Sequence, residues 1–232
     1  MILRKCLTIL GLFFIILIVL GQTVVPWLAQ AALQTKLSQK LATNDVAAEI
    51  ATSPAIYLLL GRVDTLNAVA HQAKIGQVYL SEVSLQGTNI RLDMESLLTD
   101  KVQVKSADSL QLKGIINADN LREVLARKID KIENVQVTIN KDDIIITANM
   151  KIFGRMADIE MVGQIAEDAD AIYFRMTHLN IKNALIGTAK LGDIFGNVQL
   201  VAPQKLPWGL KIKQVKQTEG AIIITAQQND SK

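Results

Sequence analysis

The sequence has little cysteine. Its single one, Cys6, lies in the N-terminal hydrophobic segment, so no intramolecular disulfide can form. A lipoprotein cysteine follows the apolar run of its signal sequence, whereas Cys6 stands at the beginning of the run. We expect an ordinary membrane-facing thiol here, with palmitoylation as the alternative.

Aromatic residues and clusters of one charge sign are also scarce. Aromatics make up 4% of the 232 residues, while 50% of the residues are hydrophobic, so an aliphatic core is expected. The net charge is +3, and Arg4 and Lys5 supply two of these charges, which leaves 23 basic against 22 acidic residues. A nucleic-acid-binding protein needs a clustered basic face, and no run of Lys or Arg provides one.

Catalytic motifs are missing as well. The sequence contains no Gly-x-Ser-x-Gly, no phosphate-binding glycine loop and no dinucleotide fingerprint. His71 and His178 fall on different predicted strands, and the acidic groups Asp142-Asp143 and Glu167-Asp168-Asp170 fall at predicted turns, where Asp is favoured. We therefore expect no catalytic residue, no metal and no cofactor, with calcium at the acidic turns as the alternative.

The N-terminal segment indicates a membrane span. Arg4 and Lys5 precede an uncharged stretch, and a helix from Cys6 to Val25 would extend about 30 Å, the thickness of a bilayer core. Pro26 is expected to break or redirect this helix. Because positive charges stay on the cytoplasmic side, the rest of the chain is expected outside the cytoplasmic membrane.

We expect this segment to be an uncleaved signal-anchor. The alternative is a cleaved signal peptide with its site near Ala29-Gln30-Ala31, which lies far beyond the apolar run. Trp27 fits an interfacial anchor or, equally, a core residue of the following helix. The predicted organisation is an anchor at residues 1–26, one domain at 27–228 and a polar tail at 229–232.

The domain is predicted to be α+β, with an antiparallel meander and few helices. Leu33, Leu37 and Leu41 recur every four residues, which predicts an amphipathic helix from Trp27 to Leu41. Alternating apolar residues predict many short strands after it, with a turn at Gly87-Thr88-Asn89 and a hairpin turn at Asn140–Asp143. A second helix, capped by Asn117 or Asp119, is expected to reach about Lys128. The sheet is expected to curl around the first helix and leave an apolar groove.

Several segments resemble a known family. Ser53 to Arg62 reads Ser-Pro-Ala-Ile-Tyr-Leu-Leu-Leu-Gly-Arg, strands follow from Val63, Ile116-Asn117-Ala118-Asp119-Asn120-Leu121 opens a helix, and Leu206-Pro207-Trp208-Gly209-Leu210 comes late. In this order they resemble the LmeA family of bacterial phospholipid-binding proteins, over roughly Leu28 to Ala226. The resemblance implies a curved antiparallel sheet wrapped along a long helix, as in tubular lipid-binding domains, and an envelope protein that binds phospholipid without catalysis.

Our first hypothesis is therefore that phospholipid is the partner, held or transferred through an apolar groove. The residues expected to line the groove are Leu33, Leu37, Leu41, Ile56, Leu59 and Leu60, although all six would also suit a closed core. The alternatives are an envelope assembly protein that binds a protein partner through its sheet edges and, less favoured, an enzyme acting on lipid or cell wall.

Overall fold

The computed structural model of the chain describes residues 2–75, 78–93, 95–96, 103–129, 132–152, 155–168, 171–182, 198–201 and 206–228. For residues 1–20 and 152, 168, 201 and 207 no side chain is described. The expected polar tail at 229–232 lies outside the described residues.

The described elements are mostly strands, and the α-helices lie in the first half of the chain. That half contains α1 (Ile2–Leu41), β1 (Val46–Ala51), the 3-10 helix η1 (Ala55–Leu60), β2 (Arg62–Ile75), β3 (Val78–Leu92), β4 (Val104–Ser106), β5 (Ser109–Asn117) and α3 (Ala118–Lys128). The second half contains β6 (Ile132–Ile139), β7 (Ile144–Ile152), β8 (Arg155–Asp168), β9 (Ala171–Lys182), β10 (Val198–Val201), the 3-10 turn η4 (Pro207–Gly209), β11 (Lys211–Thr218) and β12 (Ala221–Gln227).

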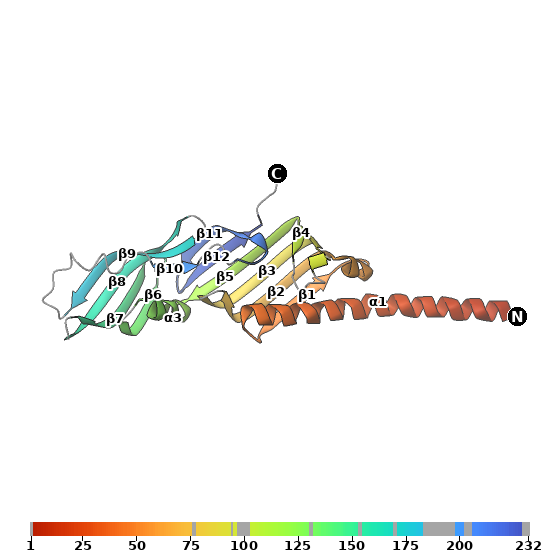
Figure 1. Cartoon of the computed structure of the whole chain (residues 1–232), viewed down its shortest axis with the longest axis horizontal. Coiled ribbons are helices and arrows are strands. Elements are labelled where there is room, and N and C mark those ends of the chain that lie inside the picture. The colour runs from red at the N-terminus through yellow and green to blue at the C-terminus, as the bar shows by residue number, and fades with distance from the viewer. Residues whose placement is uncertain are drawn as a thin grey trace.

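The described strands form two antiparallel sheets where the sequence predicted one meander. The first has the order β1-β2-β3-β5-β12-β11 with β4 beside β3, and the second has the order β10-β9-β8-β7-β6. The difference arises because β5 pairs with β12, which the chain reaches only after completing the second sheet. The two sheets lie one after the other along the long axis, and the first is curled like half a barrel (Figure 1).

Helix α1 packs its C-terminal end against β1, β2 and η1, and its N-terminal part extends beyond the sheet (Figure 1). The helix continues through Pro26, so the predicted break there is wrong: proline removes one backbone hydrogen bond, which the turns on either side tolerate. A sheet wrapped around a long amphipathic helix is not shown. In the part of the chain whose side chains are described, no helix is long and apolar enough to cross a membrane. The span from Cys6 to Val25 stays a prediction.

The predicted turn at Gly87-Thr88-Asn89 is also wrong. Strand β3 continues through these residues, because it is hydrogen-bonded to β2 on one side and β5 on the other. Glycine serves packing here: a Cβ on Gly87 would lie 2.6 Å from Cδ1 of Ile90 and 3.0 Å from Cδ1 of Leu110. Asn89 has a left-handed backbone, with φ of 47°, inside the strand.

Other local predictions are confirmed. The Asn117 side chain accepts a hydrogen bond from the Asn120 backbone N–H at 2.9 Å and so caps α3, which ends at Lys128 as expected. The Asn140–Asp143 turn joins β6 and β7, with the Asn140 backbone N–H donating to the Asp143 carbonyl oxygen. These features depend on neighbours within four residues, which is why the sequence predicts them.

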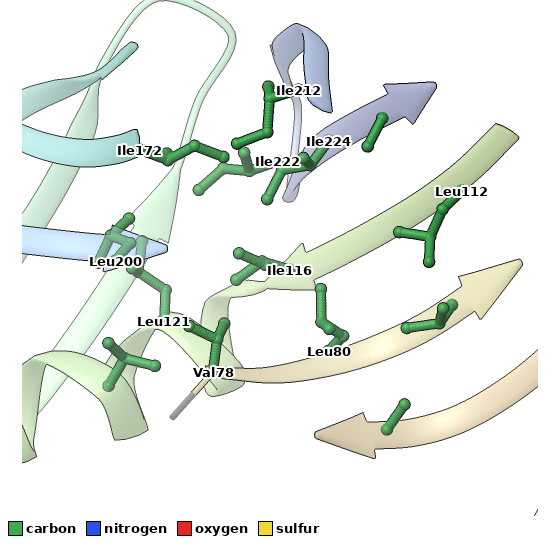
Figure 2. Packing of buried hydrophobic residues seen from close by; sticks show 14 of the residues in the cluster. Val78, Leu80, Leu112, Ile116, Leu121, Ile172, Leu200, Ile212, Ile222 and Ile224 are labelled. Atoms are coloured by element: carbon green, nitrogen blue, oxygen red, sulfur yellow. The ribbon is translucent and has the colours of Figure 1, made fainter. Parts of the chain in front are cut away.

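One aliphatic core joins both sheets. In Figure 2, Leu121 of α3 lies near Val78 and Ile116 of the first sheet and Leu200 of the second. The hairpins of the two sheets are also hydrogen-bonded, because the Gly220 backbone N–H donates to the Ile139 carbonyl oxygen at 2.8 Å. The two sheets are therefore parts of one folded unit.

Gly163 in β8 is expected to be intolerant of any side chain. A Cβ there would lie 2.5 Å from the backbone oxygen of Arg175 and 2.5 Å from Cζ of the buried Phe174. The backbone oxygen cannot rotate away, so Gly163→Ala should lower the free energy of unfolding by about 1–3 kcal/mol. Denaturant titration followed by circular dichroism measures this difference.

The matched control is Gly114→Ala in β5. The nearest atom to a Cβ at Gly114 is Cδ2 of Leu80, at 2.9 Å, and this is the end of a flexible side chain that can move. The Gly114 variant should lose clearly less stability than the Gly163 variant. Equal losses would show that the close approach at Gly163 has no special role.

Candidate functional site

Small side chains form a hollow on the inner face of the first sheet. Ala68 of β2 lies opposite Leu85 of β3, which lies opposite Leu112 of β5. In the next row Ala70 lies opposite Val83, which lies opposite Gly114. Alanine fills little space, so Ala68 and Ala70 leave room on the β2 side of these rows.

The last turns of α1 cover this part of the sheet and leave a cavity of about 280 Å³. This volume is just below the range of about 300–1,000 Å³ typical of small-molecule sites. The lining residues come from α1, three strands of the first sheet and η4: Leu37, Lys40, Leu41, Ala68, Val69, Ala70, Ile75, Val83, Leu85, Leu112 and Trp208. Ten of these are apolar, so the cavity suits an aliphatic ligand.

The charged lining residue is Lys40, which is exposed to solvent at the cavity. Its amino nitrogen Nζ lies 5.9 Å from the centroid of the Trp208 ring, within cation–π range. A cation beside an apolar cavity provides one position for a negatively charged group at its entrance.

Trp208 has the backbone conformation that residues of its size adopt least easily. Its φ and ψ are 57° and 25°, in the left-handed region, and Gly209 follows with φ of 68°. Such conformations are retained only where the surroundings impose them, commonly at functional sites. The indole Nε1–H is buried and has no hydrogen-bond partner among the described residues, so it is an available donor.

The structure places the six sequence-predicted site residues in three different environments. Leu37 and Leu41 are buried and line the cavity. Leu33 packs against the core without lining the cavity. Ile56, Leu59 and Leu60 lie on η1, where they are 50%, 56% and 69% exposed. Contact of these six residues with lipid stays a prediction.

The geometry of η1 explains why its large side chains point outward. A 3-10 helix has three residues per turn, so residues three apart share a face. Ala55 is buried and Leu58 packs on the core, which leaves Ile56 and Leu59 on an outer face. Gly61, with φ of 75°, ends the helix. No side chain caps its start, and the Ser53 backbone N–H donates to Asp64.

A larger hollow of about 730 Å³ has a different chemistry. Its lining is mostly amides and hydroxyls, including Asn67, Gln86, Thr88 and Gln111. Such a surface is well hydrated and offers no apolar environment for a lipid chain. Among the described residues, no group of three or more His, Cys, Asp or Glu side chains is placed to hold a metal ion.

Sequence reasoning missed most of the cavity wall. Ala68, Ala70, Val83 and Leu85 were visible only as strand residues, because alternation predicts which face they occupy but not where a hollow forms. Trp208 had a better signal, since it is one of two tryptophans and stands in a Pro-Trp-Gly sequence.

The antiparallel first sheet and helix α1 together enclose a mostly apolar cavity. The chain belongs to the LmeA-like phospholipid-binding family, whose family model matches residues 20–227. The resemblance drawn from the sequence is thus confirmed, and lipid binding is the function that the family indicates. Comparisons with curated proteins and with solved structures found no significant match.

Proposed function

We propose that this chain binds phospholipid at the outer side of a membrane to which its N-terminal helix anchors it. The observation that carries the proposal is the aliphatic cavity with Lys40 at its entrance. Burial of an acyl chain there is favourable by about 0.8 kcal/mol per methylene, and Lys40 can attract the headgroup phosphate. The cavity holds part of one chain, so the remainder of the lipid stays outside.

The anchoring part of the proposal rests on the sequence. Arg4 and Lys5 precede an uncharged apolar segment of spanning length, and positive charges favour a cytoplasmic N-terminus. The domain would then act without catalysis, either holding lipid beside the membrane or passing it on.

Fluorescence of Trp208 tests the proposal. The full chain carrying Trp27→Phe keeps Trp208 as its single tryptophan, and it is reconstituted into phosphatidylcholine vesicles whose acyl chains are brominated or unmodified. Lys40, beside Trp208, is 15 residues beyond Val25, which is about 22 Å along a helix, so bilayer lipid does not reach the ring. We expect bromine to quench Trp208 because a lipid chain enters the cavity.

The complementary variant Trp208→Phe retains Trp27 and reports contact with the bilayer itself. Quenching of Trp27 together with unquenched Trp208 in a folded protein would contradict lipid binding in the cavity. It would favour the alternative of an envelope assembly protein, for which a stoichiometric protein partner would then be sought.

A further inference from the structure

Exposed large hydrophobic residues gather on η1 and on the part of α1 just beyond the first sheet. Within the part of the chain whose side chains are described, eight such residues are exposed: Val24, Trp27, Leu28, Ile56, Tyr57, Leu59, Leu60 and Met156. Seven of them lie on α1 or η1, and only Met156 lies elsewhere. Singly scattered apolar residues need no explanation, but a gathering of this kind marks an interaction site.

The location of these residues points to a particular partner. Helix η1 contacts α1 at the end of the first sheet from which α1 extends away (Figure 1). Val24, Trp27 and Leu28 have the spacing i, i+3, i+4 at the end of the predicted span. A bilayer that holds residues 6–25 would have its surface at this level, beside η1.

The turn that carries the exposed side chains is well fixed. The Gly61 backbone N–H donates to the Leu58 carbonyl oxygen at 3.0 Å, and the Leu92 N–H donates to the Gly61 carbonyl oxygen at 2.8 Å. Ala55, on the same turn, is 2% exposed. The apolar side chains of η1 are therefore held outward by a turn whose other residues are packed.

Charge beside η1 is nearly balanced. Arg62 pairs with Asp64 at 2.9 Å, and Lys105 pairs with Asp93 at 3.2 Å. The Ser53 backbone N–H, together with Arg62, lowers the pKa of Asp64, so this carboxylate stays ionised and paired. The hollow beside η1 is lined by one further cation, Arg91, and one further anion, Glu95. A partner that is recognised by its charge does not fit this surface, whereas the apolar boundary of a bilayer does.

We propose that η1 is a membrane-docking surface whose residues Ile56, Leu59 and Leu60 insert into the outer leaflet of the bilayer that α1 spans. The inference rests on the anchoring proposed above. In this proposal the three residues contact the bilayer itself and not the lipid held in the cavity. Leu37 is nine residues beyond Leu28, so the cavity would stand about 14 Å above the docked surface.

A fluorophore that responds to its environment tests the docking. Cys6→Ser removes the single cysteine, and Leu60→Cys or Met156→Cys provides one labelling position in the full chain. Leu60 and Met156 are matched, since both are exposed, at 69% and 51%, and Met156 lies in β8 of the second sheet, away from η1. Each labelled protein is reconstituted into phosphatidylcholine vesicles with unmodified or brominated chains.

We expect the label at position 60 to be quenched by brominated lipid and to be several-fold less accessible to iodide than the label at position 156. The quenching should persist in about 1 M salt, where the Debye length is about 3 Å, because the contact is apolar. Equal iodide accessibility at both positions would overturn the proposal, as would a label at position 60 that is shielded from iodide yet unquenched by lipid, since a protein contact would then cover η1.

Failure of docking can be distinguished from failure of the proposed function. Normal quenching of Trp208 with an exposed label at position 60 would reject docking alone. Protein that does not remain with the vesicles after flotation would reject the anchor and docking together.

Discussion

Leu37→Asp is expected to lower the affinity of the protein for phospholipid at least about 100-fold. Leu37 lines the cavity and is 4% exposed. Loss of its apolar contact removes about 1.5–3 kcal/mol, and a charge facing an acyl chain adds a desolvation penalty, while each 1.4 kcal/mol is a tenfold change in affinity. Titration of brominated phospholipid against Trp208 fluorescence, in the Trp27→Phe background, measures the change.

The same substitution also tests the fold, because the new carboxylate is buried. Lys40, three residues further along α1, can pair with it and limit the loss of stability. Circular dichroism and thermal unfolding must therefore accompany the titration. Gln39→Asp, an exposed position on the same helix, adds an equal charge and should leave lipid affinity nearly unchanged.

Ala70→Leu fills the cavity without burying a charge, so its effect on lipid affinity is free of the second effect of Leu37→Asp. Ala70 is 2% exposed and lines the cavity, so a larger aliphatic side chain occupies space that the lipid would need. This variant should keep the stability of the unsubstituted protein, and its affinity for lipid should be lower. Unchanged affinity in folded Leu37→Asp and Ala70→Leu proteins would show that the cavity is not the lipid site.

Leu121→Ala is expected to destabilise the whole domain by about 2–5 kcal/mol. Leu121 is fully buried in α3, and this helix contacts β3 and β5 of the first sheet and β6 and β10 of the second. Domains of this kind have about 5–15 kcal/mol of total stability, so the loss is a large fraction of it. Denaturant titration should show a lower midpoint with a single transition, because one core joins the sheets.

Arg122→Ala is the control in the same helix. Arg122 is half exposed and pairs with Asp119 at 3.2 Å, a surface interaction worth at most about 1 kcal/mol. Alanine favours helix more than either residue, so helix propensity cannot explain a loss at Leu121. A similar midpoint for both variants, or two separate transitions for Leu121→Ala, would contradict a core shared by the two sheets.

Features that depend on adjacent residues were predictable from the sequence, and features that depend on distant residues were not. The Asn117 cap, the Asn140–Asp143 turn and the glycine end of η1 were predictable because each depends on a few adjacent residues. The turn at Gly87-Thr88-Asn89 was mispredicted because turn-forming residues were overridden by pairing on both sides of β3. A glycine needed for close packing has the same appearance in a sequence as one needed for a turn.

The sequence by itself determined the apolar N-terminal segment, the alternating strands, the capped helix and the family. These follow from composition, periodicity and short motifs, which are properties of neighbouring residues. Only the tertiary structure decided that Ala68 and Ala70 would face Leu37 across a cavity, that Trp208 would meet Lys40, and that Leu59 and Leu60 would point outward. Contacts between residues far apart in the chain depend on how the sheet curls and where α1 crosses it, and no local pattern encodes either.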